Sequence, residues 1–327
     1  MFGGITIIAS MLAGILLPAL ALANETTRLA APPAAPLAPD NEVLQEVIVT
    51  APEPRYVAPT RRDRIGRIWA PVYINDKGPF RLVLDTGASH SGVIASVADR
   101  LGLPLNHADN IQLLGVTGSA RVPTVRVNSM VVGDLLMNGK RLPILTDALG
   151  GAEGILGTDG LADKRIYIDF RSDLIMIRRS RNERAAHGFM TIPVTFARGK
   201  LLVVDARMGG IKVKAIIDTG GQVTIANLAA RDALFRRPPR RPPTIDTIVG
   251  ATMDEQKGEG HVPPPIIFGN IQIRARHMTF GDMRIFEHWK MIDEPAVLIG
   301  MDVLGQLDAL VIDYRRGELQ VLMPNSG

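Results

Sequence analysis

The stretch Phe80-Arg81-Leu82-Val83-Leu84-Asp85-Thr86-Gly87 decides the fold of this chain, because it describes a buried strand that delivers a carboxylate to a tight turn. Three aliphatic residues in succession predict a strand buried on both faces. Gly87 lets the backbone turn sharply and approach another segment closely. The Thr86 hydroxyl is small enough to hydrogen-bond main-chain groups in such a crowded place. A single Asp-Thr-Gly triplet fits an ordinary turn equally well, so the rest of the chain has to decide.

The pattern returns later in the chain as Val213-Lys214-Ala215-Ile216-Ile217-Asp218-Thr219-Gly220. Two further features recur in the same order and at a similar offset. Gly154-Ile155-Leu156-Gly157-Thr158-Asp159 is followed by Val297-Leu298-Ile299-Gly300-Met301-Asp302. Ile166-Tyr167-Ile168-Asp169-Phe170-Arg171 is followed by Leu310-Val311-Ile312-Asp313-Tyr314-Arg315. Three repeated features in the same register predict an internal duplication.

Most of the chain beyond residue 65 consists of short aliphatic and β-branched runs separated by Gly, Pro, Asn and Asp. This texture predicts many short strands joined by tight turns. We expect only brief helices, at residues 96–101 and 228–234. Two inserts in the second half, residues 235–244 and 253–265, are expected to be loops.

Composition excludes several classes of function. The 327-residue chain is 46% hydrophobic, which is enough for a substantial core. It contains no cysteine, which excludes disulfides, a thiol nucleophile and Cys-ligated zinc. Its six histidines show no metal-ligand spacing, so we expect no metal and no other cofactor. The net charge of +4 is not concentrated on one element, and we therefore expect no nucleic-acid partner.

The N-terminus predicts export. Residues 5–22 are almost wholly apolar and end in Ala21-Leu22-Ala23, the small-x-small pattern of a signal-peptidase site. We interpret residues 1–23 as a signal peptide or a membrane anchor, since an apolar run of about 18 residues is at the lower limit for spanning a bilayer. Residues 24–64, rich in Ala and Pro, are expected to form a linker. The expected location is periplasmic or secreted, or anchored to the inner membrane through residues 5–22 if the segment is not cleaved.

Each Asp-Thr-Gly triplet follows an aliphatic run, and each is followed some 70 to 80 residues later by apolar-apolar-Gly. Two such arrangements are a far more specific signal of a functional site than one triplet. In these features the chain resembles the retropepsin-like aspartic peptidases over roughly residues 65–325, in the bacterial exported type with both halves in one chain. The resemblance implies a mainly β fold of two closed β-barrel halves related by pseudo-twofold symmetry, with few short helices. The halves would be residues 65–182 and 183–327.

The resemblance also implies a site. Asp85 and Asp218 would be catalytic, and because two carboxylates within about 3 Å of each other cannot both ionise cheaply, they would share a proton. The flaps that cover substrate would be Gly-containing hairpins between the two motifs of each half. The residues expected to support the active site are Thr86, Gly87, Thr219, Gly220, Ile155, Leu156, Gly157, Leu298, Ile299 and Gly300, and the flap candidates are Gly115, Val116, Thr117, Gly118, Gly250, Ala251 and Thr252.

Two details refine this expectation. Ala88 and Gly221 follow the two triplets, and neither has a hydroxyl that could donate to the neighbouring carboxylate. Since such donors favour the charged form, we expect the pair to work at mildly acidic to neutral pH. Asp159 and Asp302 follow the supporting motifs and are expected to cap a short helix after each.

The sequence thus predicts a monomeric aspartic endopeptidase that acts on polypeptide, with segments of exported or membrane proteins as its substrates. The alternative is a catalytically silent module of the same fold that binds peptides or proteins. A structural β-barrel with coincidental triplets is the weakest interpretation, because the supporting motifs repeat as well. The preferred side chains around the cut are not encoded in any motif.

Overall fold

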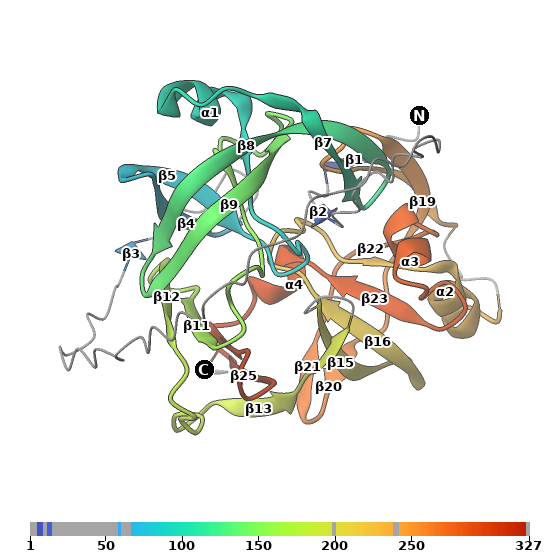
Figure 1. The fold of residues 1–327 in the computed structure, drawn as a ribbon. Coiled ribbons are helices and arrows are strands. Elements are labelled where there is room, and N and C mark those ends of the chain that lie inside the picture. Colours follow the sequence, from blue (N-terminus) through green and yellow to red (C-terminus); the bar gives the residue numbers. More distant parts are fainter. Residues whose placement is uncertain are drawn as a thin grey trace, which may run out of the picture.

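The computed structural model describes residues 5–8, 12–14, 58–59, 67–197, 201–237 and 242–324. Strands predominate in these ranges, so the mainly β fold expected from the sequence is confirmed (Figure 1). The helices of the described ranges are short: α1 (Ala95–Leu101), α2 (Leu228–Leu234), α3 (Arg284–His288) and α4 (Met301–Leu304). The first two match the helices expected from the sequence; α3 was not expected.

Strands of the first half close into a barrel. The pairing runs β8-β4-β5-β10-β6-β9, and β9 pairs with β8 again to complete the ring. Leu82, Val83 and Leu84 in β5 are all at most 1% exposed, as a triplet buried on both faces requires. The strands are β4 (Trp69–Ile74), β5 (Lys77–Leu84), β6 (Gly92–Ile94), β7 (Asn106–Gly115), β8 (Ser119–Val132), β9 (Leu135–Leu145) and β10 (Gly154–Leu156).

The second half pairs its strands in a corresponding order, β19-β22-β17-β23-β16-β15-β20. The insert at residues 253–265 was expected to be a loop, but strand β19 occupies much of it. The run Val262-Pro263-Pro264-Pro265 separates β19 from β20. Proline has no N–H to donate to a strand ladder, so β19 and β20 remain two separate strands. The first half has a single long strand, β8, at the corresponding place. The strands are β14 (Thr195–Ala197), β15 (Leu201–Met208), β16 (Ile211–Ile217), β17 (Ile225–Ala226), β18 (Thr244–Val249), β19 (Glu255–His261), β20 (Ile266–Phe268), β21 (Ile271–Ile273), β22 (Met278–Phe280) and β23 (Ala296–Ile299).

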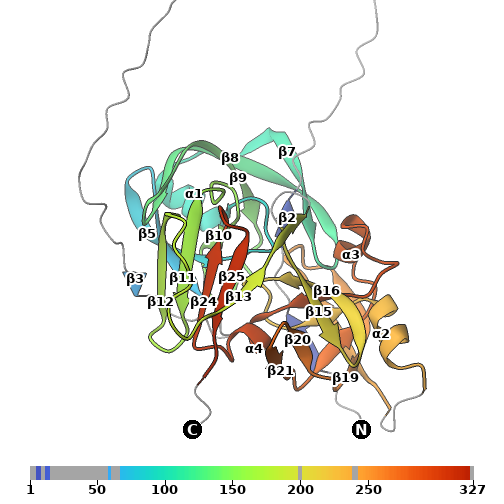
Figure 2. The same cartoon turned by 90° about the horizontal axis from the view of Figure 1, so that it is seen from below.

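A third sheet contains strands from both halves of the chain. Its order is β13-β25-β24-β11-β12-β3, and β11 and β24 lie side by side in Figure 2. In this pair Ile166 lies opposite Ile312. These two residues belong to the third repeated feature of the sequence. The duplication and the twofold relation between the halves stay predictions, as do the domain boundaries. The strands of this sheet are β3 (Ala58–Pro59), β11 (Lys164–Asp169), β12 (Leu174–Arg179), β13 (Met190–Pro193), β24 (Ala309–Asp313) and β25 (Glu318–Leu322).

Two short strands precede the linker. β1 (Ile5–Ile8) pairs with β18, and β2 (Leu12–Gly14) pairs with β7. The rest of residues 1–23, the predicted signal peptide or anchor, lies outside the described residues. The same holds for residues 24–64, apart from β3. None of the helices within the described ranges is long and apolar enough to cross a bilayer.

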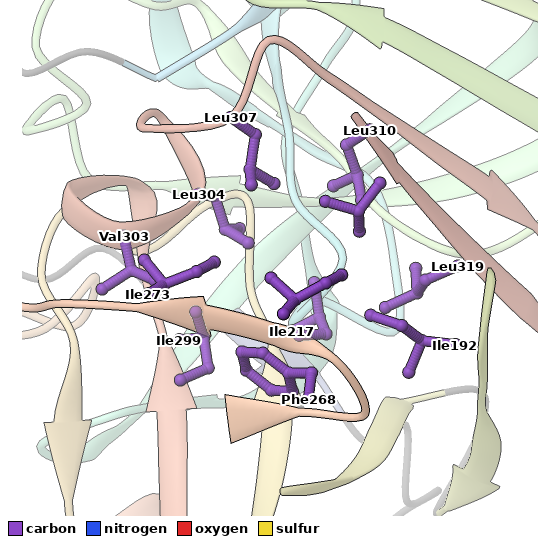
Figure 3. Close-up of a pocket in the computed structure, with 12 residues that line it drawn as sticks. Ile192, Ile217, Phe268, Ile273, Ile299, Val303, Leu304, Leu307, Leu310 and Leu319 are labelled. Atoms are coloured by element: carbon purple, nitrogen blue, oxygen red, sulfur yellow. The ribbon is translucent and has the colours of Figure 1, made fainter. Parts of the chain in front are cut away.

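A small cavity of about 20 Å³ lies in the core of the second half (Figure 3). Every side chain that lines it is apolar, and these include Ile217 and Ile299, the residues before Asp218 and Gly300. With no polar group to hold a substrate, it is a packing defect behind the second Asp-Thr-Gly turn rather than a binding site.

Candidate active site

Two strands deliver the two aspartates in the same way. Asp85 directly follows β5, and its backbone N–H donates to the Leu156 carbonyl of the parallel strand β10 at 3.0 Å. Asp218 directly follows β16, and its N–H donates to the Ile299 carbonyl of the parallel strand β23, also at 3.0 Å. The apolar-apolar-Gly segments expected to support the triplets therefore lie beside the strands that carry them. Each fixes the backbone at the aspartate itself.

The two threonines bring the turns together. Thr86 Oγ1 donates to the Ile217 carbonyl, and Thr219 Oγ1 donates to the Leu84 carbonyl, both at 2.7 Å. Each hydroxyl also accepts the other threonine's backbone N–H, at 3.1 and 3.2 Å. Both side chains are completely buried. Four hydrogen bonds thus hold the strand ends side by side, and the aspartates with them.

The two carboxylates face each other in a buried site. Asp85 is 1% and Asp218 0% exposed. Asp85 Oδ1 accepts the N–H groups of Gly87 and Ala88 at 2.8 and 3.0 Å, and Asp218 Oδ1 accepts that of Gly220 at 3.0 Å. No protein donor among the described residues reaches either Oδ2 atom. The two side chains interact with each other, so a proton on one is hydrogen-bonded by the other.

Burial sets the acidity of the pair. It raises the pKa of Asp85 to about 6, against the opposing effects of the hydrogen bonds from Asp218, Gly87 and Ala88 and of the positive charge of Arg67. Burial also raises the pKa of Asp218 well above its ordinary value, and the charge of Asp85 and the hydrogen bond to it act in the same direction. The arrangement therefore holds one proton between two carboxylates over a range around neutral pH.

Three glycines near the pair lie so close to other segments that no side chain would fit. A Cβ atom added at Gly220 would lie 2.2 Å from Asp85 Cγ. Added at Gly157 or Gly300, it would lie 2.5 Å from the carbonyl carbon of His90 or 2.6 Å from that of Val223. These approaches leave no room for a side chain. They explain why the second triplet and both supporting motifs contain glycine.

Two serine or threonine side chains support the turns through hydrogen bonds that the sequence did not reveal. Ser91 donates its hydroxyl to Asp159 Oδ1 at 2.7 Å and accepts the Gly157 N–H at 3.1 Å. Thr224 likewise donates to Asp302 Oδ1 at 2.7 Å and accepts the Gly300 N–H at 3.1 Å. The expectation that the two aspartates cap helices is wrong. Gly300 is the N-cap of α4, and turns follow Gly157.

The flap candidates form two hairpin tips that meet. Residues 115–118 join β7 to β8, and residues 250–254 join β18 to β19. Thr117 Oγ1 donates to the Asp254 carbonyl at 2.7 Å and accepts the Gly250 N–H at 2.9 Å. Val116 is fully buried, and its carbonyl accepts the Ile285 N–H of α3 at 3.1 Å. Gly115, Gly118, Ala251 and Thr252 complete the two tips.

No cluster of three or more potential metal ligands occurs in the described part of the chain. The chemistry that the arrangement offers is acid and base catalysis by one shared proton between two carboxylates.

Comparison with known proteins agrees with this geometry. A family model described as aspartyl protease matches residues 70–159, which include the first Asp-Thr-Gly turn, the first hairpin tip and the first supporting motif. A search of curated proteins finds no match to the chain. The matched residues include the strands that build the closed barrel. The match therefore supports a retropepsin-like aspartyl protease over residues 70–159 of the chain.

Proposed function

We propose that this protein is an aspartic endopeptidase that hydrolyses peptide bonds with a water molecule activated between Asp85 and Asp218. The observation that carries the proposal is the pair of buried carboxylates whose Oδ2 atoms receive no protein donor among the described residues. Burying two ionisable groups together is costly, and a module that only binds peptides has no need of them.

The proposed reaction needs no covalent enzyme intermediate. One carboxylate accepts a proton from the water as the water oxygen bonds to the carbonyl carbon of the substrate. The other, protonated carboxylate donates to the carbonyl oxygen. The tetrahedral intermediate then collapses as the C–N bond breaks and the leaving nitrogen takes up a proton from the pair. Thr86 and Thr219 contribute by keeping the two carboxylates in register, and the supporting strands by holding each aspartate's backbone.

Extended polypeptide is the proposed substrate. Strands β7 and β18 lead into the two hairpin tips. β2 pairs with the outer edge of β7, and β1 pairs with the outer edge of β18. A peptide bound there would gain backbone hydrogen bonds whatever its side chains. The apolar N-terminal segment supports the further proposal that the protein acts outside the cytoplasm, on segments of exported or membrane proteins, and works as a monomer because one chain supplies both aspartates.

A mixed peptide library tests the proposal. The full chain is incubated with the library from about pH 3 to 8, which brackets the titration of such a pair, and the products are identified by mass spectrometry. We expect cuts that accumulate with time, with peptides from membrane-protein segments cut before those from soluble proteins. A folded protein that binds peptides without cutting any of them would favour the silent binding module.

A further inference from the structure

The residue opposite Asp85 on the neighbouring strand is a buried arginine. Strands β4 and β5 are antiparallel, with Trp69 opposite Val83 and Ala70 opposite Leu82. A hydrogen bond of 3.0 Å from the Leu84 N–H to the Ile68 carbonyl continues this pairing toward the strand end. One residue further, the same register places Arg67 opposite Asp85. Directly opposed residues of an antiparallel pair project their side chains from the same face.

The second half has a leucine at the corresponding place. Strands β15 and β16 are antiparallel, with Val203 opposite Ile216. Two residues further along the same register, Leu201 lies opposite Asp218. The Leu201 side chain is 5% exposed and carries no charge. The two aspartates therefore share the same backbone setting but have different cross-strand neighbours, a cation for Asp85 and an aliphatic side chain for Asp218.

The cation is costly to bury and acts on Asp85. Arg67 is completely inaccessible to solvent, and its Nη2 atom donates to the Leu149 carbonyl at 2.6 Å. A buried guanidinium costs several kcal/mol unless other groups compensate it. Its positive charge lowers the pKa of Asp85, whereas the largest effects on the pKa of Asp218 are burial and the negative charge of Asp85, which both raise it. Within the described residues, the other titratable groups that interact with Asp85 are Asp218 and the buried phenol of Tyr314. The pKa of Tyr314 is itself raised by burial and by the charge of Asp85.

We propose that Arg67 is a positioning residue that assigns the two roles: it holds the negative charge of the pair on Asp85 and leaves the proton on Asp218. This proposal rests on the proposed peptidase function. Asp85 accepts the proton of the attacking water, and Asp218 donates its proton to the carbonyl oxygen. When the C–N bond breaks, Asp85 gives its proton to the leaving nitrogen, and Asp218 recovers a proton from a hydroxyl of the intermediate. Both carboxyl groups return to their starting states.

The test compares matched variants at corresponding positions. Arg67→Met removes the charge but keeps an unbranched side chain, and Leu201→Met changes the residue opposite Asp218 without altering charge. Without the cation, Asp85 ionises less readily, so the acid limb of the pH profile of kcat/KM should move about one pH unit higher in R67M. It should stay in place in L201M, and Arg67→Lys should stay near the wild type. An R67M enzyme with an unmoved acid limb would overturn the proposal, because a purely structural arginine changes stability without moving that limb.

A second measurement needs neither cleavage nor a folded R67M protein. Asp carboxyl carbons are labelled with ¹³C in the wild-type chain and titrated by NMR, with Asp85→Asn and Asp218→Asn providing the assignments. We expect the Asp85 carboxyl to ionise at lower pH than that of Asp218, and the opposite order would refute the assignment. Because this titration does not depend on turnover, a protein that cuts no peptide but shows the expected order would count against the peptidase function alone.

Discussion

Thr86 and Thr219 exchange hydrogen bonds across the centre of the molecule, each hydroxyl donating to the carbonyl of the residue before the opposite aspartate, Ile217 or Leu84. Because the hydroxyls also accept each other's backbone N–H, the two threonines satisfy four buried main-chain groups. The position of each aspartate is thus tied to the strand that carries the other. Two turns that are 133 residues apart in the chain act as one unit.

Replacing either threonine by valine should destabilise the protein. Thr86→Val and Thr219→Val each remove a hydroxyl and leave buried carbonyl and N–H groups unpaired, at a cost of roughly 1 to 3 kcal/mol for each unsatisfied group. Unfolding in urea, followed by circular dichroism, measures the loss.

Thr124→Val is the matched control for these variants. Thr124 is also a fully buried threonine, but its hydroxyl has no hydrogen-bond partner among the described residues. Its replacement should be neutral or slightly stabilising. Equal losses for Thr124→Val and Thr86→Val would show that the exchanged hydrogen bonds contribute nothing special.

The acid–base pair should make stability depend on pH in an unusual direction. The pKa of Asp85 rises from 3.8 to about 6 on folding, and that of Asp218 is also raised, so the folded protein binds protons more tightly than the unfolded chain. This contribution to stability is fully present below about pH 4 and is lost as the pH rises through about 6. Asp218→Asn should therefore become more stable than the wild type as the pH rises from 4 to 7, by on the order of 1.4 kcal/mol per pKa unit removed.

Thermal unfolding across this pH range checks the prediction. Asp205→Asn is the control, since the Asp205 side chain is 84% exposed and lies outside the pair. A stability difference between Asp218→Asn and wild type that does not change between pH 4 and 7 would be incompatible with a buried, proton-sharing pair.

The contact between the two hairpin tips should limit how fast they separate. Thr117→Val removes the hydroxyl that donates to the Asp254 carbonyl and accepts the Gly250 N–H. The Gly250 amide should then exchange its hydrogen about tenfold faster, as expected for the loss of about 1.4 kcal/mol. Thr117→Ser keeps the hydroxyl and should exchange at close to the wild-type rate. If valine and serine gave the same rate, the tips would be held by other contacts, such as the burial of Val116.

Much of the fold follows from local patterns. The aliphatic triplets before Asp85 and Asp218 identify two buried strands, and the repetition of the later Gly-containing motifs identifies the strands that pair beside them. These features need only a few adjacent residues to be recognised. The prediction of a loop at residues 253–265 was wrong because β19 contains no aliphatic residue and is stabilised by pairing with β18 and β22.

The parts that could not be predicted depend on register between distant strands. Nothing around Arg67 distinguishes it from the other arginines near the linker until the pairing of β4 with β5 sets it opposite Asp85. Thr117 likewise becomes informative only when its hairpin tip meets Asp254 from the other half. Asp159 and Asp302 were assigned to caps because their partners, Ser91 and Thr224, lie 68 and 78 residues away.

The most direct test of the account is peptide cleavage by Asp85→Asn and Asp218→Asn beside the wild type, at the pH where the wild type cuts fastest. Asp302→Asn is the control, since Asp302 accepts the Thr224 hydroxyl close to the site without belonging to the pair, and it is exposed to solvent. Since general acid and base catalysis both fail without the pair, each of the two variants should lose about 10³-fold in kcat/KM while Asp302→Asn stays within a few-fold. A folded Asp85→Asn or Asp218→Asn protein that cleaves at the wild-type rate would contradict the central claim.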